Sequence, residues 1–234
     1  MLSIIIPTLN EEECLPLLLD SIKKQHVHDY EIIVADAKSK DKTLDIVKQH
    51  GCRVVEGGLP AKGRNNGAKA AKGELLFFLD ADTVLPENFF EKSLREFSKR
   101  KLDIASFCLR PYPENRFEYF LINMFYNKMM VVLENILPHA AMGILVKREL
   151  FSKINGFDES ITLAEDHDFA RRCSKFSRFG VIRSAEVSVS TRRFKKDGWL
   201  VIGGKFFLCQ LHMIFIGPVR SGIFNYKFNH YKND

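Results

Sequence analysis

Two carboxylates, Asp80 and Asp82, follow the apolar run LLFFL (residues 75–79) with one alanine between them. Carboxylates this close repel each other, and burial against the end of a strand raises the cost. A divalent cation would remove the repulsion, and Mg²⁺ and Mn²⁺ both suit oxygen ligands. The alternative is a helix N-cap, because Pro86 stands where a following helix could begin. The surrounding elements have to decide between the two.

A second candidate for ligand binding is the cationic loop GGLPAKGR (residues 57–64). Lys62 and Arg64 flank Gly63 directly ahead of a helix that we predict over residues 65–72. A helix N-terminus with a flexible glycine and two cations is a natural site for an anion. The alternative is a solvated loop without a ligand.

Strands and helices alternate through the first half of the chain. Short β-branched and aromatic runs predict strands, and helical periodicity predicts helices. The predicted strands are residues 2–6, 31–36, 53–56 and 75–79, and the predicted helices are residues 14–22, 43–49 and 65–72. Such alternation indicates parallel βαβ units whose sheet is covered on both faces. Ligands of these sheets bind at the carboxyl ends of the strands, where Asp36, Asp80 and Asp82 lie.

Five segments, in this order, resemble family 2 glycosyltransferases of the GT-A fold. They are SIIIPTLNEEECL, EIIVADAKSKDKT, GRNNGAKAAKGELLFFLDADT, INGFDE and LAEDHDFARR, and the resemblance covers residues 2–194. It implies an α/β domain with a nucleotide-binding, Rossmann-like, mostly parallel sheet flanked by helices. It also implies transfer of a sugar from a nucleotide-sugar with inversion at the anomeric carbon.

The resemblance implies where the nucleoside of the donor would bind. Pro7, Thr8 and Glu11 would line the nucleotide base, and Asp36 would accept a hydrogen bond from the base or the ribose. The chain departs from the family at this point, because it reads DAKS (residues 36–39) where the usual run is close to Asp-Asp-Gly-Ser. The resemblance therefore leaves the base open, with UDP- and GDP-sugars as the expected donors.

The resemblance assigns the diphosphate and its cation to Asp80 and Asp82. Asp82 would be the more direct ligand of Mg²⁺ or Mn²⁺, while Asp80 would face the ribose or metal-bound water. Arg64 would lie near the donor. A cation here neutralises the charge that develops on the departing nucleoside diphosphate.

The acceptor side is assigned in the same way to Glu165 and Asp166. Asp166 would be the general base that takes the proton from the acceptor hydroxyl, with Glu165 supporting it. The alternative is a charged first turn that caps a helix over residues 169–175. Arg192 and Arg193 resemble the basic-aromatic element that closes over the donor, although they suit anionic lipid head groups equally well.

Two later segments are largely apolar. In residues 116–137 the polar side chains fall on one narrow stripe, so we expect a helix buried on most sides, with a dimer or membrane contact as the alternative. Residues 199–219 hold one charge, Lys205, but glycines and polar residues interrupt them. We expect a core, subunit-interface or interfacial membrane helix there rather than a membrane span. The predicted division is a catalytic domain at residues 1–194 and a basic, apolar helical appendage at residues 195–234.

The net charge of +6 is concentrated between residues 171 and 205, where ten Lys and Arg face two acids. This predicts an anionic partner: substrate phosphates, a membrane surface or nucleic acid. A nucleic-acid-binding module would not explain acids at strand ends, so we expect no nucleic acid partner. Five cysteines without a CxxC pair indicate reduced thiols in a cytosolic protein. The N-terminus lacks the basic region of a signal peptide, and we expect a cytoplasmic protein with peripheral contact to the cytoplasmic face of a membrane.

The sequence thus predicts a metal-assisted inverting glycosyltransferase that acts in a single displacement. Its acceptor would be a glycan hydroxyl or a lipid phosphate, and a homodimer is left open. One rival is a degenerate protein that binds nucleotide-sugar without transferring it, suggested by Ala37 and Lys38. Another is a nucleotidyltransferase, which the loop PTLNEE (residues 7–12) disfavours, because those enzymes usually carry a Gly-rich loop with Arg there.

Overall fold

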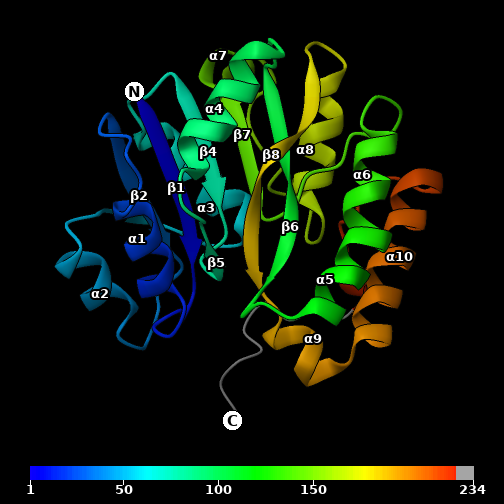
Figure 1. The fold of residues 1–234 in the computed structure, drawn as a ribbon, viewed down its shortest axis with the longest axis horizontal. Coiled ribbons are helices and arrows are strands. Elements are labelled where there is room, and N and C mark those ends of the chain that lie inside the picture. Colours follow the sequence, from blue (N-terminus) through cyan, green and yellow to red (C-terminus); the bar gives the residue numbers. More distant parts are fainter. Residues whose placement is uncertain (225–234) are drawn as a thin grey trace.

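A mixed sheet of eight strands forms the centre of the structure, a computed structural model that describes residues 1–224. The strand order is β3-β2-β1-β4-β7-β6-β8-β5, and helices cover both faces (Figure 1). The strands are β1 (Leu2–Thr8), β2 (Tyr30–Asp36), β3 (Arg53–Glu56), β4 (Leu75–Leu79), β5 (Thr83–Val84), β6 (Ile104–Tyr112), β7 (Gly143–Lys147) and β8 (Phe179–Ser190).

The helices alternate with the strands as far as β4 and become more frequent after β6. They are α1 (Leu15–Lys23), α2 (Thr43–Gln49), α3 (Pro60–Ala70), α4 (Phe89–Lys99), α5 (Arg116–Ile122), α6 (Lys128–Leu133), α7 (Arg148–Lys153), α8 (Glu165–Ser174), α9 (Arg192–Asp197) and α10 (Trp199–Phe215). A π-helical turn (Asn123–Asn127) joins α5 to α6, and a short 3₁₀ turn follows at Gly222–Phe224.

The first half of the sheet is parallel, as the predicted alternation of strands and helices implies. β1 lies between β2 and β4 and pairs in parallel with both, and β3 extends the sheet beyond β2. β7 then inserts antiparallel to both β4 and β6, and β8 runs parallel to β6. The carboxyl ends of β1, β2 and β4 therefore meet at one edge, where Thr8 pairs with Asp36.

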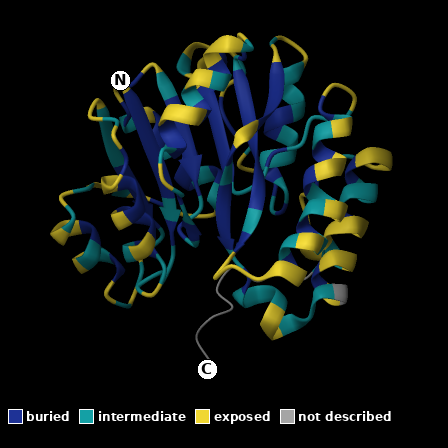
Figure 2. Cartoon of the chain, viewed as in Figure 1, coloured by how far each residue is buried: buried dark blue, intermediate teal, exposed yellow. Residues whose placement is uncertain are grey.

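Both faces of the sheet are buried, which explains the continuous apolar runs in its strands. Successive side chains of a strand point to opposite faces, yet the three isoleucines at residues 4–6 all have 0% exposure. In β4, Phe77 belongs to the apolar cluster on one face and Phe78 to the cluster on the other. Figure 2 shows this buried centre as dark blue strands. A closely packed core thus supports the carboxyl edge of the sheet.

α3 lies close to the sheet because it carries glycines on its buried face. It begins at Pro60, five residues before the predicted start at residue 65. A Cβ on Gly67 would lie 2.3 Å from Cγ2 of Ile5, which is closer than side-chain atoms pack. The glycine therefore sets the distance between α3 and β1, and with it the position of Arg64 on the same helix.

The close approach predicts opposite effects for one substitution at two helical glycines. Gly67→Ala should lower the free energy of unfolding by about 1–3 kcal/mol, because the added methyl overpacks the contact with β1. Gly203→Ala in α10 is the matched control, because a Cβ there meets nothing within 4 Å. It should raise stability by about 0.5–1 kcal/mol. Urea unfolding followed by circular dichroism measures both, and a Gly67→Ala protein as stable as wild type would contradict the close packing.

The helical segment at residues 116–134, hereafter the inverted segment, is not buried on most sides, and that prediction was wrong. Three of its polar side chains point inward: Glu118, Asn127 and Glu134 are 6%, 3% and 9% exposed. Much of its apolar surface lies outward instead, and Phe125 is 72% exposed. Figure 2 shows the exposed residues along α5 and α6 in yellow. The polar stripe was located correctly in part, but it faces the sheet rather than water.

α10 follows the short basic helix α9 and packs against the loop before α8. Cys209 and Met213 of α10 form a small apolar cluster with Leu163 and Val219. No helix within residues 1–224 combines the length and the apolar character that crossing a membrane requires. The predicted domain boundary at residue 195 stays a prediction. The last part of the predicted appendage, residues 225–234, lies outside the described residues.

Candidate active site

The loops that follow β1 and β2 meet around one buried carboxylate. Asp36 accepts hydrogen bonds from the hydroxyls of Thr8 (3.2 Å) and Ser39 (2.6 Å) and from the Ser39 N–H (2.9 Å). Lys38 stands where the family usually has glycine and adopts a left-handed φ of 65°, at a cost of about 1–2 kcal/mol. The turn is therefore kept without the glycine. Pro7, one residue before Thr8, lies against α3.

Arg64 of α3 lies between the two acidic groups. Its guanidinium donates from Nη2 to Asp80 Oδ1 (2.7 Å) and from Nη1 to Glu165 Oε1. Only 5% of Arg64 is exposed. Burial opposes its charge, but the carboxylates of Asp80, Glu165 and Asp166 prevail and raise the pKa of Arg64. One buried cation thus joins the end of β4 to the first turn of α8.

The residue after Arg64 holds neighbouring elements together. Asn65 donates from Nδ2 to the carbonyl oxygen of Phe157 and accepts from the Phe157 N–H, both at 2.9 Å. Phe157 in turn stacks on Phe169 of α8, with ring centroids 4.1 Å apart. This contact links α3, the INGFDE segment and α8. We did not predict Asn65 or Phe157 as site residues, although both lie in segments that carried the resemblance.

Asp82 and Arg192 line a hollow of about 200 Å³. Burial and the charge of Asp80 raise the pKa of Asp82 to about 6, although Arg193 and Arg192 oppose the shift. Burial and the charge of Asp82 likewise raise the pKa of Glu11 to about 7. Arg192 reaches across, with Nη2 3.3 Å from Glu11 Oε2. The structure therefore brings four predicted residues together: Glu11, Asp82, Arg192 and Arg193.

Asp166 lies in the first turn of α8, which begins at residue 165 rather than at the predicted residue 169. Burial raises the pKa of Asp166 to about 7, opposed by the charge of Arg64 and helped by that of Asp80. The backbone N–H of His167 donates to its Oδ1 at 2.8 Å. Of its side chain, 15% stays exposed. A carboxylate with this pKa can accept a proton near neutral pH.

Two histidine rings in contact, tilted by 42° to each other, lie beside Asp166. The ring centroids of His139 and His167 are 3.6 Å apart, and His167 Nε2 is 3.7 Å from Asp166 Oδ1. Burial lowers the pKa of His167 to about 3 and holds the pKa of His139 well below its usual range. Both rings are therefore neutral at physiological pH. They wall off one side of Asp166 without adding charge.

The sequence matches the family described as Glycosyl transferase family 2 over residues 3–156. The chain belongs to this family. It is 30% identical over 188 residues to an uncharacterized glycosyltransferase, EpsJ, of Bacillus subtilis strain 168, which covers 72% of this chain and 54% of that protein. The chain thus spans about half the length of this relative.

Solved glycosyltransferase structures share the fold. S. aureus TarS 1–349 in complex with UDP-GlcNAc aligns with a TM-score of 0.66 at 22% identity, covering 82% of this chain and 58% of that one. The mannosyltransferase PcManGT from Pyrobaculum calidifontis, in complex with GDP-Man and Mn²⁺, gives 0.71 at 19% identity, covering 88% and 61%. The predicted GT-A fold of this family 2 member is confirmed.

Two alternatives for the charged residues of this glycosyltransferase family member were wrong. Asp80 and Asp82 do not cap a helix, because α4 begins at Phe89 with Asn88 at its N-cap, beyond strand β5. The solvated loop is the other, because Arg64 lies inside α3, is 5% exposed and bonds Asp80 and Glu165. The anion site at this place stays a prediction. The charged first turn of α8 is present, and it holds the same Glu165 and Asp166 that the resemblance singles out.

The acids after β4 fit a divalent cation. Asp80 and Asp82 offer hard oxygen ligands, and the charge of one raises the pKa of the other. Within residues 1–224, no cluster of three or more acidic, histidine or cysteine side chains is arranged as a metal site. Magnesium sites in enzymes commonly use one or two carboxylates together with substrate phosphates, and a pair of acids matches that chemistry.

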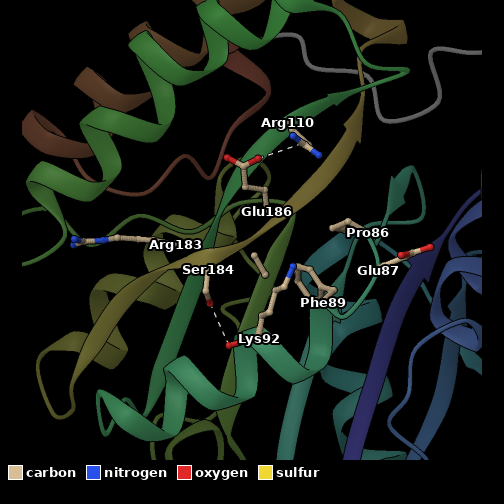
Figure 3. Close-up of a pocket in the computed structure, with 9 residues that line it drawn as sticks. Pro86, Glu87, Phe89, Lys92, Arg110, Arg183, Ser184 and Glu186 are labelled. Atoms are coloured by element: carbon tan, nitrogen blue, oxygen red, sulfur yellow. Dashed lines mark hydrogen bonds and ion pairs between the residues drawn. The ribbon is translucent and has the colours of Figure 1, made fainter.

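A larger hollow, about 270 Å³, lies apart from these acids (Figure 3). It opens between α4 and β8, and on its wall Arg110 pairs with Glu186 at 3.2 Å. Lys92 and Ser184 contribute to the same wall, joined by a hydrogen bond from the Ser184 hydroxyl to the Lys92 carbonyl. Its lining, within the described chain, includes none of the predicted site residues. The hollow therefore adds nothing to the candidate active site.

The raised pKa of Asp166 predicts how stability depends on pH. The unfolded state loses this proton near the ordinary value of 3.8 and the folded state only at about 7, so the folded state binds more protons between these values. Stability therefore falls as the pH rises through this window. Asp166→Asn removes that loss and should raise the free energy of unfolding by about 4 kcal/mol at alkaline pH. It should give no gain at the acidic end of the window.

Urea unfolding at both ends of the window measures this difference. Asp168→Asn is the matched control: Asp168 pairs with Arg172 at 2.6 Å, so that variant should lose stability rather than gain it. An Asp166→Asn protein that is less stable than wild type at alkaline pH would contradict the assignment of a desolvated carboxylate.

Proposed function

We propose that the chain transfers a sugar from a UDP- or GDP-sugar to an acceptor, with inversion at the anomeric carbon. The observation that carries this proposal is the placement of two acidic pairs on either side of Arg64 at the carboxyl edge of the sheet. Family membership supports it. Further support comes from proteins of the same fold solved with UDP-GlcNAc and with GDP-Man and Mn²⁺.

The donor diphosphate is proposed to bind at the acids after β4. Asp82 and Asp80 would hold Mg²⁺ or Mn²⁺, with Asp82 as the more direct ligand because Arg64 already engages Asp80. When bound, such a cation neutralises charge on the departing nucleoside diphosphate. Arg192 and Arg193 lie close enough to Asp82 to oppose its pKa shift, and their guanidinium groups suit phosphate oxygens.

The nucleoside is proposed to bind at the carboxyl ends of β1 and β2. Pro7, Thr8 and Glu11 would line the base. Asp36, which three hydrogen bonds hold in place, would accept a further hydrogen bond from the base or the ribose. Because the turn after Asp36 lacks the usual second acid, the base is left between uracil and guanine.

On the acceptor side, Asp166 would remove the proton from a hydroxyl as its oxygen bonds to the anomeric carbon. The bond from that carbon to the diphosphate oxygen breaks in the same displacement, so no glycosyl-enzyme intermediate forms. Glu165 supports Asp166 by holding Arg64. A lipid phosphate is already ionised and would need no proton removal.

The two rival functions lose their support. Membership of a glycosyltransferase family argues against a nucleotidyltransferase. A degenerate nucleotide-sugar-binding protein was suggested by the altered turn after Asp36, but Lys38 keeps that turn in a left-handed conformation. One acid of each pair, Asp80 and Glu165, also bonds Arg64.

The remaining parts of the proposal concern where the enzyme works. We propose a catalytic domain at residues 1–194 and a C-terminal segment at residues 195–234. We also propose a glycan or lipid-linked acceptor, peripheral contact with the cytoplasmic face of a membrane, and no nucleic acid partner. A homodimer is the alternative to membrane contact.

The donor assignment predicts stabilisation that depends on both nucleotide and metal. A UDP- or GDP-sugar with Mn²⁺ or Mg²⁺ should raise the thermal midpoint by about 5–10 °C near hundredfold saturation, and EDTA should abolish most of the shift. Asp82→Asn should lose the metal dependence. Glu87→Gln, an exposed acid in the following loop, is the matched control and should respond as wild type. A metal-dependent shift that survives in Asp82→Asn would remove this residue from the site.

The base assignment predicts a loss of turnover without a loss of donor binding. Asp166→Asn should lower kcat for a hydroxyl acceptor by about 10²–10⁴-fold, because the proton has no acceptor in the transition state. The nucleotide-induced thermal shift should stay unchanged. Asp168 lies two residues after Asp166 in α8 and pairs with Arg172. Asp168→Asn should therefore keep most of its turnover. Full turnover by Asp166→Asn with a hydroxyl acceptor would rule out the base.

A further inference from the structure

The inverted segment presents several large apolar side chains to the exterior, from its first turn to its last. Phe117, Phe120 and Val132 are 66%, 57% and 74% exposed. Phe125 is 72% exposed. A helix at the surface of a water-soluble protein normally buries such residues and exposes its polar ones. The inverted segment therefore has the side-chain distribution of a helix whose outer face meets an apolar medium.

Specific hydrogen bonds fix this orientation. Asn127 donates to the carbonyl oxygen of Leu109 and accepts from the Leu109 N–H, both at 2.8 Å. Glu134 accepts from the Val181 N–H at 2.9 Å. Turning the segment over would bury apolar groups but leave these partners without hydrogen bonds, at about 1–3 kcal/mol for each buried group in general. The outward apolar face is thus built into the contact with β6 and β8.

α10 adds a second apolar face next to the first. Figures 1 and 3 both show it running beside the inverted segment. Phe207 and Phe215 are 63% and 80% exposed, while Ile202 and Cys209 on another side are buried. We call the two faces together the two-helix surface, defined by Phe117, Phe120, Phe125, Val132, Phe207 and Phe215.

The charges around the two-helix surface are positive. Residues 192–224 contain six Lys and Arg and one acid, Asp197. In the inverted segment both acids are buried, whereas Arg116 and Lys128 are exposed. A second copy of the chain would bring like charges together, since the same patch faces itself in a two-fold dimer. Anionic lipid head groups would instead complement the cations while the acyl boundary receives the aromatic side chains.

We propose that the two-helix surface binds to the face of an anionic phospholipid bilayer. Exposed aromatic and aliphatic side chains enter the boundary between head groups and acyl chains, and the exposed side chains of Lys128, Lys195 and Lys196 meet lipid phosphates. Membrane binding by this surface does not depend on glycosyl transfer.

The same surface bears on the class of acceptor, and this step rests on the proposed function. α10 packs on the helix that carries the proposed base: Arg171 of α8 donates from Nη1 to the Met213 carbonyl oxygen at 3.2 Å. The charges of Asp166 and Glu165 also help to raise the pKa of Cys209, after burial, so α10 lies close to both acids. A bilayer at the two-helix surface therefore places lipid on the acceptor side of the site, and the acceptor is a lipid-linked sugar or lipid phosphate.

Vesicle sedimentation of the full chain tests the membrane surface. The chain should bind phosphatidylcholine vesicles that contain phosphatidylglycerol at least about tenfold more tightly than phosphatidylcholine alone, because each cation near an anionic surface contributes. Binding should weaken as salt is raised. Phe125→Asp and Phe215→Asp should each weaken binding at least about tenfold, since an apolar contact with the bilayer is replaced by a charge.

Phe176→Asp is the matched control, because Phe176 is 62% exposed but lies at the end of α8, outside the two-helix surface. It should bind as wild type, and thermal unfolding should show all three variants folded. No binding to anionic vesicles, or an equal loss in Phe176→Asp, would overturn the proposal. A dimer in lipid-free sedimentation velocity that Phe125→Asp converts to monomers would assign the surface to a second copy instead.

The assay contains no donor, so its failure is separate from failure of the proposed function. If the chain does not bind vesicles but is stabilised by nucleotide and metal, the donor assignment stands and the proposed membrane surface is wrong. A chain that binds vesicles but shows no nucleotide-dependent shift keeps the surface and loses the transferase assignment.

Discussion

The structure depends on a buried cation that bonds two carboxylates, one buried and one partly exposed. Arg64 is 5% exposed and bonds Asp80 and Glu165, which belong to different elements. Ionised carboxylates at such positions would be costly without a partner, and the guanidinium fork can serve two of them at once. α3 can carry Arg64 to this place only because Gly67 lets the helix approach β1. The absence of a side chain at Gly67 therefore helps to place the charge of Arg64 in the site.

The cation does not neutralise the whole site. Glu11, Asp82 and Asp166 all have pKa values raised to about 6 or 7, with burial as the first cause and neighbouring carboxylates as another. Near neutral pH these three carboxyl groups can therefore either hold a proton or, when ionised, bind another cation. That condition suits a divalent cation at Asp82 and a proton acceptor at Asp166, and Arg64 keeps the two functions physically apart while linking their positions.

Much of the first half could be predicted, because each element there has a local signal. The strands β1, β2 and β4 are largely apolar runs that end at, or just before, a polar residue: Thr8, Asp36 and Asp80. Their parallel pairing follows from the intervening helices. The start of α3 was predicted five residues too late, although Pro60, which favours the first helical position, marks it in the sequence. The antiparallel insertion of β7 between β4 and β6 has no local signal, because it is decided by contacts between strands distant in sequence.

The inverted segment shows a different limit of sequence reasoning. A polar stripe such as that of Asn127 and Glu134 defines a line along a helix, but the pattern alone does not say which side faces the protein. The usual assumption, apolar inward, presumes that water is the only outer solvent. Here the inner side offers unpaired strand groups of Leu109 and Val181 that only polar side chains can satisfy. The hydrogen-bonding needs of the sheet therefore determine that the aromatic side chains face outward, where the proposed bilayer would meet them.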